Sequence, residues 1–116
     1  MAQDRSKPVG KLLEDAVRRF EGAQSRRDGT IVLRLQGEGG GEFHLHSDSN
    51  GCRLSRQAGQ GQPLVEIIGD AAKVRAVLDG SREGLAQFYR GGIRVRGDLR
   101  YLSGLAHELG FIRQPF

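Results

Sequence analysis

Between residues 8 and 22, apolar side chains recur three or four positions apart. The recurring residues are Val9, Leu12, Leu13, Ala16, Val17 and Phe20. This spacing predicts an amphipathic helix with one apolar stripe, which begins near Pro8 and ends by Gly22. Residues 1–7 are polar and show no period. We therefore expect a flexible N-terminus over residues 1–7 and a single domain over residues 8–116.

From residue 30 onward, apolar positions alternate with polar ones at a period of two. The alternating segments are Thr30–Gln36, Glu42–His46 and Cys52–Gln57. Segments rich in glycine and serine separate them, so they predict a three-stranded antiparallel meander with one buried face. The side chains expected on that buried face are Ile31, Leu33, Leu35, Phe43, Leu45, Cys52 and Leu54. After a short loop, Leu64–Ile68 predicts a fourth strand.

Helical spacing returns after the fourth strand. Asp70 fits the N-cap of a helix that ends at Gly80, and a shorter helical turn carries Phe88. Ile93–Arg96 then alternates as a fifth strand, and Asp98 fits the N-cap of a last helix. The apolar stripe of that helix is Leu99, Leu102, Leu105 and Leu109. The order α-βββ-β-αα-β-α predicts an α+β fold, in which helices cover one face of a five-stranded mixed sheet.

Composition narrows the class of protein. Glycine is frequent, at 18 of 116 residues, and its clusters mark turns and not a repeat. No apolar run reaches the roughly 18–20 residues that a membrane helix needs, and no signal-peptide core follows Met1. The single cysteine, Cys52, excludes an intramolecular disulfide and a multi-cysteine zinc site. We therefore expect a cytoplasmic protein, and the heavy use of arginine favours a bacterial source.

The second half of the chain resembles the sterol carrier protein domain family. The resemblance rests on Gly69-Asp70, on the helix end at residues 78–80 and on the segment from Phe88 to Asp98, FYRGGIRVRGD. That family closes with an aromatic residue, a glycine, a strand of alternating basic and apolar residues, and Gly-Asp before a helix. The order of elements extends the resemblance over residues 9–110. It implies an apolar tunnel between sheet and helices that binds sterols, fatty acids, acyl-coenzyme A or phospholipids without catalysis.

This resemblance assigns an apolar ligand to the layer between the sheet and the helices. The residues expected to line it are Leu35, Phe43, Leu45, Leu78, Phe88, Leu102, Leu105 and Leu109. The last helix and the apolar tail at residues 111–116 are expected to act as a lid. Gly97 and Asp98 are expected to be structural, with the Asp98 carboxylate capping the last helix. Each lining residue is equally an ordinary core residue, so the alternative function is a protein-interaction or accessory module with a closed core.

The outward face of the predicted sheet carries two weaker hypotheses. Glu42, His44 and His46 share that face, but zinc normally needs three or four ligands, and a solvated strand face explains the pattern as well. Four arginines share it too, and they offer a site for an acidic protein or an anionic headgroup. These are Arg34, Arg53, Arg94 and Arg96. No aromatic side chain accompanies them for base stacking, which argues against nucleic acid as a partner.

Catalytic motifs are absent from the sequence. The glycine-rich segment at residues 37–41 lacks the Lys-Ser/Thr pair of a phosphate loop, and no nucleophile elbow is present. We therefore expect a protein without catalytic activity, cofactor or bound metal.

Overall fold

The helices and strands follow the order that the sequence predicts. The computed structural model describes residues 8–19, 28–48, 51–57, 62–78 and 92–109. Within these ranges the elements are α1 (Val9–Arg19), β1 (Gly29–Gln36), β2 (Gly41–Asp48), β3 (Gly51–Ser55), β4 (Val65–Asp70), α2 (Ala71–Leu78), β5 (Ile93–Gly97) and α4 (Leu99–Glu108). The predicted N-terminal segment, the helical turn around Phe88 and the C-terminal tail lie outside the described residues.

The strands form one sheet in the order β3-β2-β1-β4-β5. β1, β2 and β3 pair antiparallel in turn, which confirms the predicted meander. β4 pairs parallel with β1, and β5 pairs antiparallel with β4, so the sheet is mixed. β1 therefore lies at the centre, with Leu33 opposite Phe43 on one side and opposite Ile67 on the other. The predicted α+β class with a five-stranded mixed sheet is confirmed.

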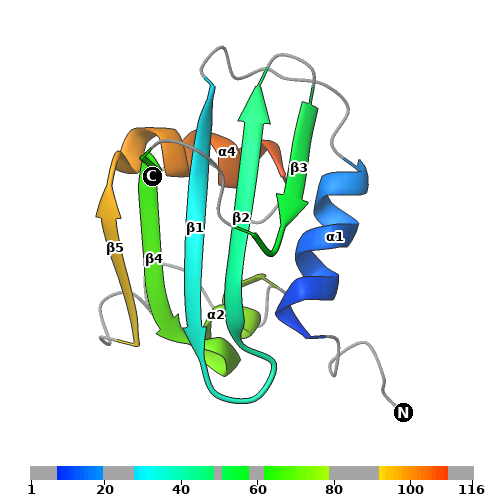
Figure 1. Ribbon diagram of the computed structural model, residues 1–116, viewed down its shortest axis with the longest axis vertical. Helices are drawn as coiled ribbons and strands as arrows, with labels where there is room; N and C mark the ends of the chain where they lie inside the picture. The colour runs from blue at the N-terminus through cyan, green and yellow to red at the C-terminus, as the bar shows by residue number, and fades with distance from the viewer. Residues whose placement is uncertain (1–7, 20–27, 49–50, 58–61, 79–91, 110–116) are drawn as a thin grey trace.

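The helices gather on the face of the sheet that carries the apolar side chains. Figure 1 shows α4 passing behind β1 and β2, with α1 beside β3. The buried residues of α1 (Val9, Leu13) and of α2 (Ala71, Val74) join the inward strand residues in one apolar cluster. Each Å² of apolar surface removed from water contributes roughly 25 cal/mol, so this cluster is the main source of stability. None of the described helices is long and apolar enough to cross a membrane.

A sharp corner joins β5 to α4. Gly97 has a φ of +112°, and a Cβ there would overlap the carbonyl oxygen of Leu64 and lie 3.1 Å from the Cα of Val65. Only glycine fits a position with this conformation and this close approach. Asp98 follows with extended backbone, and its carboxylate accepts a 3.0 Å hydrogen bond from the backbone N–H of Tyr101. Asp98 is therefore the N-cap that starts α4 at the next residue.

α4 turns a different face to the core than its leucine spacing predicts. Tyr101, Leu105 and Leu109 are buried, at four-residue spacing, whereas Leu99 is 45% exposed. The predicted place of Leu99 in the apolar stripe is therefore wrong. Leu99 precedes Tyr101 by two residues, which is about 200° around a helix of 3.6 residues per turn, so its side chain points away from the core.

Candidate functional site

The predicted lining residues lie together between the sheet and the helices. Five of them are at most 6% exposed and belong to the same buried cluster, namely Leu35, Phe43, Leu45, Leu105 and Leu109. Leu78 and Leu102 are partly buried and pack against that cluster. Phe88 lies outside the described residues. The fold thus brings the described members of the set into one apolar layer, and their contact with a ligand stays a prediction.

One polar pair crosses this apolar layer. Ser47 projects from β2 on the same face as Phe43 and Leu45, and its side chain is fully buried. Its hydroxyl forms a hydrogen bond with the phenol of Tyr101 on α4. A buried hydroxyl costs free energy unless it is paired, so this bond ties α4 to β2. The predicted strand stopped one residue short of Ser47, although the period of two would have placed Ser47 on the inward face.

A guanidinium group covers the layer at the seam between α1 and the sheet. Arg56 follows β3, and its Cζ lies 4.2 Å from the centroid of the Phe43 ring. Two glycines leave room for it. A Cβ at Gly41 would lie 2.8 Å from Nη2 of Arg56, and a Cβ at Gly10 would lie 3.8 Å from Nη1. The sequence placed Arg56 inside the third strand, and nothing in the local pattern indicated that it would meet Phe43.

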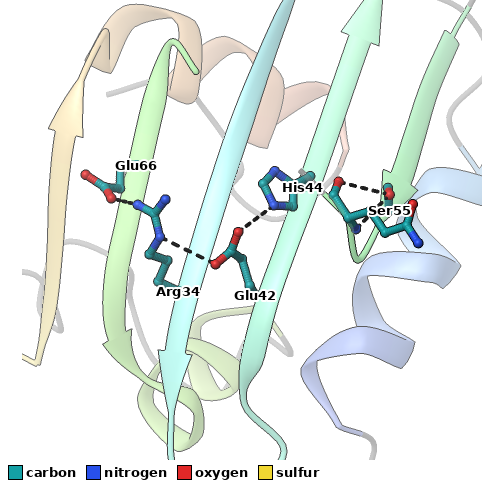
Figure 2. A network of polar contacts seen from close by, with 6 residues as sticks. Arg34, Glu42, His44, Ser55 and Glu66 are labelled. Atoms are coloured by element: carbon teal, nitrogen blue, oxygen red, sulfur yellow. Dashed lines mark hydrogen bonds and ion pairs between the residues drawn. The ribbon is translucent and has the colours of Figure 1, made fainter. Parts of the chain in front are cut away.

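The opposite face of the sheet carries a chain of charged side chains. Figure 2 shows Arg34 of β1 between Glu66 of β4 and Glu42 of β2, with His44 beyond Glu42. Arg34 forms ion pairs with Glu66 and, at 3.6 Å, with Glu42. His44 Nε2 lies 2.8 Å from Glu42 Oε2, and Arg96 Nη1 of β5 lies 3.7 Å from Glu66 Oε1. These contacts link four neighbouring strands, but most of the groups are partly solvated, so each ion pair contributes at most about 1 kcal/mol.

Two outward positions of this face are buried, contrary to the prediction of a solvated face. Val32 is 3% exposed and His44 is 7% exposed. Val32 lies on the central strand, in register with His44 of β2 and Glu66 of β4, and these larger neighbours shield it. His44 in turn lies between Val32 and Ser55 of β3. The interpretation of His44 as a solvent-exposed residue is therefore wrong, because it occupies an interior strand of the sheet.

Acidic side chains pair with most of the arginines on this face. Arg34 and Arg96 both contact Glu66, and Arg53 Nη2 lies 3.4 Å from Asp48 Oδ2. Binding of an acidic protein or an anionic headgroup would compete with these pairs. The face is consequently a weaker anion site than its arginines alone indicate.

The two histidines have separate partners. His44 contacts Glu42, whereas His46 Nδ1 lies 3.0 Å from Thr30 Oγ1 and His46 Nε2 lies 3.5 Å from Asp48 Oδ2. In the part of the chain that the structure describes, no three His, Cys, Asp or Glu side chains are grouped to hold a metal ion. The Glu-x-His-x-His pattern does not form a metal centre there.

A depression of about 370 Å³ lies on the charged face. Its lining residues are Arg34, Leu35, Gln36, Gly41, Glu42 and Ile68. Arg34, Gln36 and Glu42 place polar groups around it, and it is separated by the sheet from the apolar layer that the helices cover. Its chemistry suits a polar group better than an acyl chain.

Solved structures share this arrangement of strands and helices, although no protein-family model and no curated protein matches the sequence. The palmitated SCP2L2 protein of Aedes aegypti matches with a TM-score of 0.65 at 16% identity, over 90% of this chain and 96% of that chain. The UbiJ-SCP2 ubiquinone synthesis protein matches with a TM-score of 0.57 at 15% identity, over 90% of this chain and 81% of that chain. This chain has the fold of sterol carrier protein 2 (SCP2).

The SCP2 fold also matches part of a much larger chain. The sec-alkyl sulfatase PisA1 matches with a TM-score of 0.73 at 11% identity, over 97% of this chain but only 17% of the sulfatase chain. Identities this low establish the fold and leave the ligand open. At the level of the fold, the SCP2 resemblance seen in the sequence is confirmed.

Proposed function

We propose that this SCP2-like chain is a non-enzymatic lipid-binding or carrier domain. The observation that carries the proposal is its likeness, over nearly the whole length of both chains, to the Aedes aegypti protein whose structure is described as palmitated. The ligand would be a fatty acid, another acyl chain or a sterol-like molecule.

The proposed binding place is the apolar layer between the inner face of the sheet and the helices. Leu35, Phe43 and Leu45 would contact the ligand from the sheet, and Leu105 and Leu109 from α4. The driving force is apolar burial, at roughly 0.8 kcal/mol for each CH₂ group removed from water. A long alkyl chain would therefore bind with useful affinity without any charged contact. α4 is the proposed lid, since it packs over this layer.

Native mass spectrometry of freshly purified protein tests this proposal. We expect a species heavier than the apo-protein by the mass of a long-chain lipid, and loss of that species after organic extraction. The extracted protein should then bind an added 16-carbon chain with one-to-one stoichiometry. A single apo mass before extraction, together with no uptake afterwards, would contradict the lipid-binding function.

A second candidate function is an accessory or protein-interaction module with a closed core. The sulfatase comparison favours it, because there the SCP2 fold matches only a small part of a larger chain. The same uptake measurement separates the two functions. A module with a closed core would take up no alkyl chain, and its partner would have to be found through the charged face of the sheet.

A further inference from the structure

We propose that Arg56 anchors the charged end of the ligand, so that this domain selects long-chain molecules that end in an oxyanion. This inference rests on the proposed lipid-binding function and adds to it the chemical class of the ligand. A carboxylate or a phosphate at the end of an alkyl chain has the required chemistry.

The position of Arg56 supports this role. Its guanidinium lies over the ring of Phe43, which is 1% exposed and belongs to the apolar layer. Gly10 of α1 and Gly41 of β2 leave space beside the guanidinium, at the seam between α1 and the sheet. An alkyl chain in contact with Phe43 would therefore have its end within reach of a positive charge.

Arg56 also keeps its hydrogen-bonding capacity. Within the described parts of the chain it forms no ion pair and no hydrogen bond, and its contact is with the face of an aromatic ring. The N–H groups of a guanidinium lie in its plane, so stacking leaves them free to donate. They match the two oxygens of a carboxylate or phosphate in a bidentate pair.

The other arginines near this position are already engaged. Arg53, three residues earlier, points to the opposite face of the sheet and pairs with Asp48 at 3.4 Å. Arg34 pairs with Glu42 and Glu66. Arg56 thus combines an apolar contact on one side with donors that no described acid occupies, and this combination distinguishes a headgroup anchor from an arginine that serves solubility.

The test compares hexadecanoic acid, hexadecyl phosphate and methyl hexadecanoate as ligands of the delipidated protein. The ester has the same chain as the acid but carries no charge. Wild-type protein should bind at least one of the two anions about tenfold more tightly than the ester, which corresponds to one charged hydrogen-bonded pair. The relative affinity of the acid and the phosphate identifies which oxyanion the site prefers.

The decisive variant is Arg56→Gln, with Arg53→Gln as the matched control. Arg56→Gln should remove the preference for the anion over the ester and leave affinity for the ester unchanged. Arg53→Gln removes the same charge from the same part of the chain, on the opposite face, and should keep the preference. A second readout uses hexadecanoic acid labelled with ¹³C at the carboxyl carbon. Its bound pKa should lie lower in the wild type than in Arg56→Gln, because a nearby guanidinium stabilises the carboxylate.

The outcomes separate this inference from the function on which it rests. Equal binding of anions and ester by the wild type, or equal preference in both variants, overturns the role of Arg56 and leaves lipid binding intact. Failure of all three ligands to bind the wild type overturns the proposed function itself. If Arg56→Gln lowers the affinity for anions and ester alike, Arg56 only maintains the packing of Phe43, and the anchor role falls.

Discussion

At position 97, the absence of a methyl group allows β5 to turn into α4. Gly97→Ala should lower the free energy of unfolding by roughly 1–3 kcal/mol, because the new Cβ combines a positive φ with an overlap on the Leu64 carbonyl. Gly104→Ala is the control, since a Cβ there meets no atom within 4 Å. In a helix interior that change should stabilise by up to about 1 kcal/mol. Urea denaturation of both variants measures the two opposite signs.

The neighbouring Asp98 contributes to stability by a different mechanism. Its carboxylate satisfies the backbone N–H of Tyr101 at the start of α4. Asp98→Ala should cost roughly 0.5–2 kcal/mol, and Asp98→Asn should recover most of the loss, because asparagine caps helices about as well. Thermal denaturation checks both values. A variant with unchanged melting temperature and abolished ligand binding would show that Asp98 contacts the ligand and is not a cap.

At the scale of elements, one buried hydrogen bond joins α4 to β2. Ser47→Ala and Tyr101→Phe should each lower the free energy of unfolding by about 1–3 kcal/mol, since each leaves a hydroxyl or its site in an apolar layer. The double variant should cost less than the sum of the two, because neither partner is then left unpaired. A double-mutant cycle in urea measures the difference. Additive costs would show that the two hydroxyls do not depend on each other.

At the scale of the molecule, the prediction concerns the space between the layers. Leu105 is 1% exposed in the middle of α4, so Leu105→Trp should occupy space needed by a ligand and weaken binding of a 16-carbon chain. Overpacking should cost about 1–3 kcal/mol of stability. Leu99→Trp is the matched control on the same helix, because Leu99 is 45% exposed and faces away from the core.

Both tryptophan variants report on their own folding. The chain contains no native tryptophan, so each variant has a single indole whose emission shows whether it is buried. We expect a buried indole in Leu105→Trp and a solvated one in Leu99→Trp, with loss of ligand affinity only in the former. If a folded Leu105→Trp variant binds as tightly as the parent, the ligand does not lie under α4.

Local periodicity determined much of the architecture. The period of two in Thr30–Gln36 and Glu42–His46 predicted β1 and β2 and the side of each strand that carries Leu35 and Phe43, because side chains alternate across any strand. Gly97 and Asp98 marked the start of α4, because a corner and a cap depend on neighbouring residues. Adjacent strands joined by short turns pair antiparallel, so the meander followed as well.

What only the tertiary structure decided depends on which elements meet across long stretches of chain. The parallel pairing of β4 with β1 made β1 central, and that burial of both its faces accounts for Val32 at an outward position. The buried bond between Ser47 and Tyr101 joins residues 54 positions apart. The contact of Arg56 with Phe43 required α1 and β2 to leave room beside them. Periodicity reports the face on which a side chain lies, whereas its burial and its partners depend on what packs against that face, and no local pattern encodes that information.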